Sequence, residues 1–169
     1  FEISIFNDNA QNINGPKDSI RYENNSELFN PYLTSLSDYD ITYIFWLEKD
    51  SASISNLRYS YNFGGNWQIN QELILNGNNA DSFDAIAAND FVYVAWNEIN
   101  NTYQIRVKRI SFRNFIWLDA GGTLGINDNT SHHARNPAIA ESGSVFYAAW
   151  SEENTNGSDN VTQIRLKKL

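Results

Sequence analysis

The sequence predicts an all-β protein built from three repeats of a four-stranded antiparallel unit. Three observations lead to this prediction: a strand motif that ends in Trp-x-Glu recurs three times, a strand with an Arg at the matching position follows each copy, and the composition suits strands and turns. Aromatic residues make up 14% of the 169 residues, and Asn is abundant. Aromatic side chains favour strands and Asn favours the turns between them, so we expect strands rather than helices.

The Trp-x-Glu motif defines the repeat. It reads ITYIFWLE at 41–48, FVYVAWNE at 91–98 and VFYAAWSE at 145–152, and its tryptophans are separated by 50 and 54 residues. Each Trp has a Tyr three residues before it and a Glu two residues after it: Tyr43, Tyr93 and Tyr147, then Glu48, Glu98 and Glu152. The motif is apolar on both faces, which predicts a strand covered by a neighbouring sheet on each side.

The other strands of each unit are predicted on either side of this motif. The Arg strands are NLRYSY at 56–61, QIRVKR at 104–109 and QIRLKK at 163–168. The preceding strands are NPYLTSL at 30–36, DAIAA at 84–88 and NPAIAES at 136–142, and the outer strands are NWQINQELIL at 66–75 and FIWLDA at 115–120. The Glu and the Arg are 10, 8 and 13 residues apart, as expected for hairpins whose tips tolerate different lengths.

Four-stranded antiparallel units with a period of about 50 residues are typical of β-propeller blades. A β-solenoid is the alternative repeat architecture. We expect a single domain over 1–169, with blades at approximately 30–76, 80–120 and 134–169 and an N-terminal strand and linker at 1–29.

Three blades do not complete a propeller, because such rings contain about four to eight blades. We therefore expect the ring to be completed by oligomerisation, or the chain to be part of a larger propeller. The segment FEISIF at 1–6 alternates like a strand and has no blade of its own. It is expected to supply the missing outer strand of the third blade in another copy.

One hairpin resembles a known family motif. SYNFGGNW at 60–67 resembles the Asp-box, or BNR repeat, of sialidase-like β-propellers, and SFRNFIW at 111–117 is similar but one residue shorter and without the glycine. The matching residues are Ser60, Gly64 and Trp67, with Asn62 and Asn66 in place of the Asp and Thr of the motif. The resemblance covers 30–168. Asp-boxes are structural turns, so it implies blade architecture more than a particular activity.

The resemblance implies a non-catalytic, lectin-like module that binds carbohydrate outside the cell or at its surface. Catalytic sialidases have an arginine cluster and an early F-R-I-P-like segment, whereas Arg21 here is not followed by Ile-Pro. Two alternatives stay open: a fragment of a sialidase-like glycoside hydrolase, and a structural domain that binds a surface protein. Five sequons agree with an external location: Asn24, Asn100, Asn129, Asn156 and Asn160.

The repeated polar residues are the candidate ligand-binding site. They are Trp46, Glu48, Arg58, Trp96, Glu98, Arg106, Trp150, Glu152 and Arg165. Strand alternation places Trp96 and Glu98 on one face, and we expect the antiparallel partner strand to bring Arg106 opposite Glu98. Such a set is either a buried ion pair that stabilises the blade or a shallow sugar site in which Trp stacks on the ring. Trp67 and Trp117 are expected to hold the outer blade edges in place.

Composition excludes several other functions. The chain has 12 Lys and Arg against 20 Asp and Glu, so it lacks the positive charge that nucleic acid binding requires. It has no Cys, which excludes disulfides and thiolate metal sites, and it has no apolar run of the roughly 20 residues that span a membrane.

No cofactor is expected, although the loops at 7–15 and 125–133 could offer oxygens to calcium. The carboxylate pairs considered for glycoside hydrolysis are Asp38 with Asp40 and Asp81 with Asp84.

Overall fold

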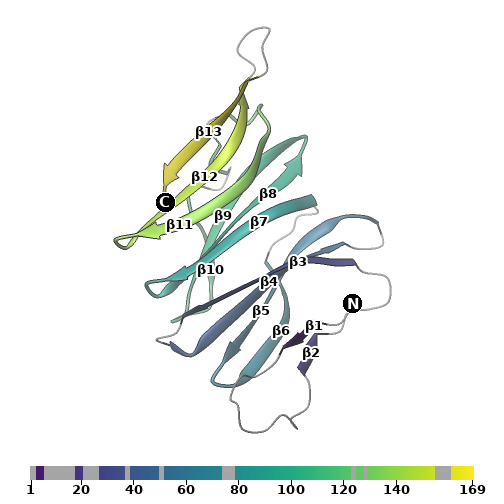
Figure 1. The fold of residues 1–169 in the computed structure, drawn as a ribbon, viewed down its shortest axis with the longest axis vertical. Helices are drawn as coiled ribbons and strands as arrows, with labels where there is room; N and C mark the ends of the chain where they lie inside the picture. The colour runs from purple at the N-terminus through teal and green to yellow at the C-terminus, as the bar shows by residue number, and fades with distance from the viewer. Residues whose placement is uncertain are drawn as a thin grey trace.

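The described part of the chain contains three large antiparallel β-sheets that follow one another in sequence and in space, and a small two-stranded sheet near the N-terminus (Figure 1). The computed structural model describes residues 3–5, 18–20, 27–36, 39–49, 52–73, 79–122, 125–127, 129–154 and 161–169. Its regular structure is β throughout this part of the chain, as the composition predicts. None of the described residues form a helix with the length and apolar character needed to cross a membrane.

Each sheet is a meander that contains one copy of the repeat. The first sheet has the strands β3 (Glu27–Leu36), β4 (Ile41–Lys49), β5 (Ser55–Phe63) and β6 (Asn66–Glu72). The second has β7 (Asn79–Ala88), β8 (Phe91–Asn100), β9 (Thr102–Ser111) and β10 (Trp117–Asp119). The third has β11 (Ala134–Ser142), β12 (Val145–Asn154) and β13 (Val161–Lys168). The Trp-x-Glu motifs lie on β4, β8 and β12, so the predicted strand order is confirmed, while the three sheets do not close into a ring (Figure 1).

The sheets pack face to face, which explains the two-sided apolar character of the central motif. One hydrophobic cluster joins the first and second sheets and includes Val92 and Trp96 of β8. A second cluster joins the second and third sheets and includes Tyr93 and Ala95 of the same strand. Alternate residues of β8 therefore belong to two different cores, and both faces must be apolar to bury them.

Short turns with left-handed backbone connect the strands. The two-residue turns Gly64–Gly65, Asn89–Asp90 and Gly143–Ser144 have positive φ at both residues. This conformation suits the twist of tight hairpins and is accessible to Gly and Asn at low cost. The Asn of the repeated Asn-Pro dipeptide also has a left-handed backbone. Asn30 and Asn136 both have a φ of 53°, and each lies at a bulge, which interrupts the pairing of β3 with β4 and of β11 with β12.

The hairpin between β5 and β6 is the one that resembles an Asp-box. The backbone N–H of Gly65 donates to the side-chain oxygen of Asn62 over 3.1 Å, and the Asn66 amide donates to the Gly64 carbonyl over 3.3 Å. These bonds satisfy turn groups that the strands leave unpaired. Asn62 thus stabilises the turn from the position at which the motif has Asp.

The outer tryptophans differ in their packing. The ring of Trp117 on β10 lies edge-on to Tyr59 and Phe45 of the first sheet, with centroids 5.4 and 6.4 Å apart. It therefore ties the outer edge of the second sheet to the first, in agreement with its expected structural role. Trp67 on β6 is half-buried.

The N-terminal segment contains a separate two-stranded sheet, in which β1 (Ile3–Ile5) pairs with β2 (Asp18–Ile20). The described part of the segment expected to join another copy, Ile3–Ile5, therefore has a local partner on one side. A nearby strand pairs at a lower entropic cost than a strand of another chain. The loop at 7–15, considered for calcium, lies outside the described residues.

Candidate functional site

The Trp, Glu and Arg of each repeat come together on two neighbouring strands. In the strand register, Trp46 lies directly opposite Arg58, and the corresponding pairs in the other sheets are Trp96 with Arg106 and Trp150 with Arg165. The residue directly opposite Glu98 is Gln104. The expectation that Arg106 lies opposite Glu98 is therefore wrong by two residues along the strand. The tight turn that pairs Asn100 with Thr102 sets this register.

Arg106 nevertheless reaches Glu98 diagonally. In the second sheet, one carboxylate oxygen of Glu98 accepts a hydrogen bond from Arg106 Nε over 2.6 Å. The other accepts from the indole N–H of Trp96 over 3.2 Å. Both oxygens of a buried carboxylate are thereby bonded, which offsets the cost of removing the charge from water.

The first and third sheets repeat this arrangement with variations. Glu48 accepts from Arg58 Nε over 2.9 Å in the first sheet. In the third sheet, Glu152 accepts from the indole N–H of Trp150 over 2.7 Å and from the backbone N–H of Asn129 over 3.1 Å. All three glutamates are buried, and each carboxylate binds groups of the chain itself.

The indole rings of these sets are covered by protein. Trp46 is 0% exposed, and Trp96 and Trp150 are each 2% exposed. A sugar ring stacks on an aromatic face only if that face is accessible. The geometry therefore supports the stabilising interpretation of the nine residues, and the ligand-binding interpretation would require the sheets to separate.

One member of the carboxylate pair on β7, Asp84, also stabilises the fold. One oxygen of Asp84 accepts from the backbone N–H of Ile139 in the third sheet over 2.9 Å, and the other accepts from Ala85 N–H over 2.9 Å. Asp81 is exposed. Asp84 thus joins two sheets, and its oxygens are occupied by backbone donors. Of the other pair, Asp40 lies in an exposed turn and Asp38 lies outside the described residues.

The loop at 125–133 bonds to β9. The side-chain oxygen of Asn127 accepts from the backbone N–H of Ile105 over 2.7 Å, and His133 Nδ1 accepts from that of Tyr103 over 3.1 Å. Within the described ranges, no three His, Cys, Asp or Glu side chains are grouped so that they could hold a metal ion.

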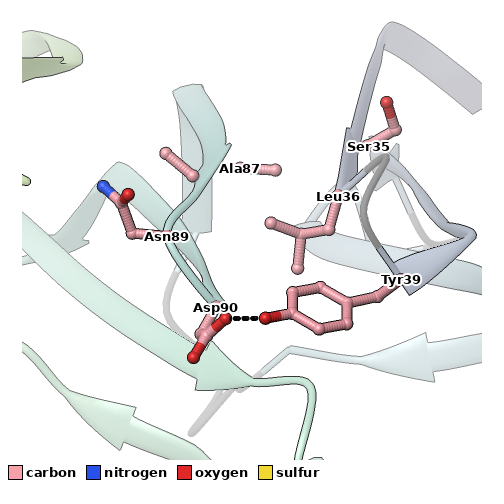
Figure 2. A pocket seen from close by; sticks show the side chains of 7 residues that line it. Ser35, Leu36, Tyr39, Ala87, Asn89 and Asp90 are labelled. Carbon is pink, nitrogen blue, oxygen red and sulfur yellow. Dashed lines mark hydrogen bonds between the residues drawn. The ribbon is translucent and has the colours of Figure 1, made fainter.

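A surface cavity of about 270 Å³ lies between the first and second sheets, at the ends of β3 and β7 (Figure 2). Its lining comes from two repeats: Ser35, Leu36 and Tyr39, and Ala87, Ala88, Asn89 and Asp90. Figure 2 shows Leu36 and Tyr39 on one side, with Tyr39 directed at Asp90 across the opening. Sequence reasoning missed this cavity because its walls lie about 50 residues apart and its turn residues have no motif of their own.

Asp90 is the charged group of this cavity. The Tyr39 hydroxyl donates to one of its oxygens, and Arg113 Nη2 lies 3.1 Å from the other. The ring of Tyr39 stacks on Phe112 with centroids 3.6 Å apart, which fixes its position. The hydrogen bond from Tyr39, followed by that from Arg113, lowers the pKa of Asp90 below its ordinary value. Asp90 is therefore an anionic hydrogen-bond acceptor at neutral pH.

Comparison of the sequence with protein-family models gave no match, and none of the curated proteins matches it.

Proposed function

We propose that the chain is a non-catalytic binding module of the sialidase-like, Asp-box β-propeller type, which binds carbohydrate outside the cell or at its surface. The observation that carries the proposal is the cavity between the first two sheets, where polar groups from both sheets surround one opening. The Asp-box-like turn and the three successive sheets support the blade architecture. The Trp-Glu-Arg sets stabilise the blades in this proposal.

The chemistry of the cavity suits a hydroxylated ligand. Asp90 and Asn89 offer hydrogen-bond acceptors, Ser35 offers a hydroxyl, and Leu36 adds an apolar wall. Small-molecule sites combine a few placed polar groups with apolar surface in about 300–1,000 Å³. A cavity of about 270 Å³ is slightly below this range, so it suits a single sugar unit of a longer glycan.

The alternative of a glycoside hydrolase has one supporting feature, the contact between the Tyr39 hydroxyl and the Asp90 carboxylate. A general acid, however, must be protonated near the working pH. The lowered pKa of Asp90 opposes this role. Hydrolysis also requires a second carboxylate, roughly 5–9.5 Å from the first, across the bound sugar.

The test is a glycan array probed with the 169-residue chain, followed by titration of the best ligand. Asp90→Asn is expected to weaken binding about 10- to 100-fold, because it removes a charged acceptor worth about 1.5–3 kcal/mol. The control is Asp81→Asn, which changes the same charge on the exposed part of β7 and is expected to leave the affinity unchanged.

Three results would contradict the proposal. Equal affinities for the Asp90→Asn and Asp81→Asn chains would place the sugar elsewhere. Absence of binding across the array, with the chain folded by circular dichroism, would favour the protein-interaction alternative. Release of a fluorogenic leaving group from glycosides would favour the hydrolase.

A further inference from the structure

Two phenylalanines lie together where the hairpins of the first and second sheets meet. Phe63 ends β5 and is 51% exposed, and Phe115 lies in the turn between β9 and β10, where it is partly exposed. Their ring centroids are 6.1 Å apart, and the ring of Phe115 stacks on that of Tyr61 with centroids 5.1 Å apart. Tyr61 therefore supports the pair, while the ring of Phe63 is accessible to a ligand.

Comparison of the repeats shows that the blade does not require a ring at Phe63. Phe63 lies opposite Ile41, the first residue of its Trp-x-Glu motif. In the second sheet, the residue opposite the first motif residue, Phe91, is Ser111. A polar side chain thus occupies the equivalent position of the second hairpin. Exposed aromatic residues that lie together, and that the architecture does not require, indicate a contact surface.

Phe115 has an unfavourable backbone conformation. Its φ is 53°, in the left-handed region that a bulky side chain rarely adopts. Gly65, which also stands two residues before the tryptophan of its outer strand, has a φ of 82° without a steric penalty. Backbone strain of this kind is concentrated at sites that contact ligands. The conformation therefore points to a role for the ring of Phe115 at the surface.

The aromatic pair is continuous with the cavity between the first two sheets. Leu36 of the cavity wall pairs with Ile41, and Ile41 pairs with Phe63 on its other side. Because neighbouring strands lie about 4.8 Å apart, Phe63 lies about 10 Å from Leu36 along the same end of the first sheet.

One turn of the second sheet contacts both places. Its Phe112 stacks on Tyr39, which lines the cavity. Three residues further along the turn, Phe115 contacts Phe63. The turn at 111–116 therefore forms one edge of the cavity and one side of the aromatic pair.

Amide side chains lie beside the exposed ring. Asn66 is directly opposite Phe63, Gln68 is opposite Tyr61, and both amide residues are exposed. A sugar ring presents C–H groups on its face, which suit the negative face of an aromatic ring. Its hydroxyl groups suit amides, which donate and accept hydrogen bonds. This combination favours a sugar unit over a purely apolar ligand.

We propose that the carbohydrate site extends from the cavity (Figure 2) to an aromatic subsite formed by Phe63 and Phe115, and that the ligand is an oligosaccharide. This inference rests on the proposed binding of carbohydrate by the cavity. One unit occupies the cavity, and a unit further along the ligand stacks on Phe63 beside Asn66. Two linked contacts bind more tightly than either alone, because the second forms at a high effective concentration.

The first test is the dependence of affinity on ligand length. The probes are neutral oligosaccharides of about one to six units, in glucose, mannose, galactose and N-acetylglucosamine series, titrated by NMR. In a series that binds, the affinity is expected to rise about tenfold once the ligand is long enough to reach Phe63. Equal affinities for short and long members would overturn the inference and leave the proposed function standing. Absence of binding in every series, monosaccharides included, would overturn both.

Variants of Phe63 identify the subsite. Phe63→Leu removes the ring but keeps an apolar side chain against Phe115, and is expected to weaken binding of the longest oligosaccharide about tenfold. Phe63→Tyr keeps a ring and is expected to retain the affinity within about twofold. The matched control is Leu118→Ala, because Leu118 is also 51% exposed but lies on the face of β10 opposite to Trp117. It is expected to leave the affinity unchanged.

Asp90→Asn separates the two parts of the site. It is expected to weaken binding of the monosaccharide and of the oligosaccharide alike, since both occupy the cavity. Phe63→Leu is expected to weaken binding of the oligosaccharide alone, with the melting temperature of the unchanged chain. If Asp90→Asn weakened binding and Phe63→Leu did not, the cavity would bind the sugar by itself and the aromatic subsite would be wrong.

Discussion

The second and third sheets contain nearly the same Arg strand in different surroundings. The sequences are QIRVK at 104–108 and QIRLK at 163–167, and both strands place the Arg opposite a Trp. Ile105 is buried, whereas the equivalent Ile164 is exposed. The motif therefore determines the strand and its register, while the neighbouring sheet determines whether its apolar residues are buried.

The edges of the two strands differ in the same way. On the side away from β8, the carbonyl oxygens of Val107 and Ile105 accept from the backbone N–H groups of Ala120 and Ile126 over 2.9 and 3.0 Å. Among the described residues, β13 has a strand partner only in β12. Strand β9 is therefore bonded along both edges and packed between two sheets, and we expect it to tolerate change less than β13.

Truncation of the equivalent isoleucines should give the largest contrast. Ile105→Ala is expected to lower the free energy of unfolding by about 2–5 kcal/mol, because it leaves a cavity between two sheets. Ile164→Ala is expected to change it by no more than about 0.5 kcal/mol in the single chain, because the side chain is already in water. Urea unfolding of the two variants and of the unchanged chain measures both effects. Similar losses would contradict the difference in environment.

The buried glutamates should give the next largest effect. Glu152→Ala removes the acceptor for Trp150 and for the Asn129 backbone, and is expected to cost about 1–3 kcal/mol. Glu153→Ala is the control on the same strand, where a partly exposed side chain is expected to contribute no more than about 0.5 kcal/mol.

Thermal unfolding followed by circular dichroism compares these two variants. Equal midpoints would mean that the Trp-Glu-Arg sets contribute little to stability, and the ligand-binding interpretation would regain support.

Loss of a single hydrogen bond between sheets should lower the free energy of unfolding less than loss of a buried glutamate. The Thr34 hydroxyl accepts from the backbone N–H of Ala87 over 3.1 Å and connects the first two sheets. Thr34→Val leaves that N–H without its acceptor at nearly constant side-chain volume, and is expected to cost about 1 kcal/mol. Thr42→Val, at another partly buried position of the first sheet, is the control. Hydrogen exchange at the Ala87 amide should accelerate only in the first variant.

Much of the fold could be predicted because the repeat reports on both local structure and packing. The apolar residues at alternating positions of β8 predicted a strand between two sheets, and Glu98 with Arg106 predicted an ion pair. The precise register could not be predicted, because it depends on the turn between Asn100 and Thr102. The cavity could not be predicted either, since it forms where turns from separate repeats meet.

The same limit applies to the aromatic residues. A tryptophan at the end of a strand is compatible with a sugar platform or with a core, and sequence does not distinguish them. Trp96 is covered because the first sheet packs on it, a contact between residues far apart in the chain. Likewise, Leu166 is exposed because no described sheet covers its face of the third sheet, and the strand itself does not determine this.

The smallest expected effect concerns the turn of β7, which contacts both neighbouring sheets. Towards the first sheet, the Asp90 carboxylate accepts from the Tyr39 hydroxyl. Towards the third sheet, the Asn89 amide donates to the Glu141 carboxylate over 3.2 Å. The pKa of Asp90, followed by NMR of its side-chain carbon, is expected below its ordinary value. Because the folded-state pKa is lowered, the contact stabilises the protein above the ordinary pKa and is lost as the pH falls through the folded-state value.

Tyr39→Phe removes the largest cause of this shift and should raise the pKa of Asp90 towards its ordinary value. Arg113→Ala should raise it less, because the Arg113 side chain is mostly exposed and solvent screens its charge. Glu141→Gln is the control at the contact of this turn with the third sheet, and it should leave the titration of Asp90 unchanged. If Arg113→Ala had the larger effect, the charge of Arg113 rather than the Tyr39 hydroxyl would hold this turn against the first sheet.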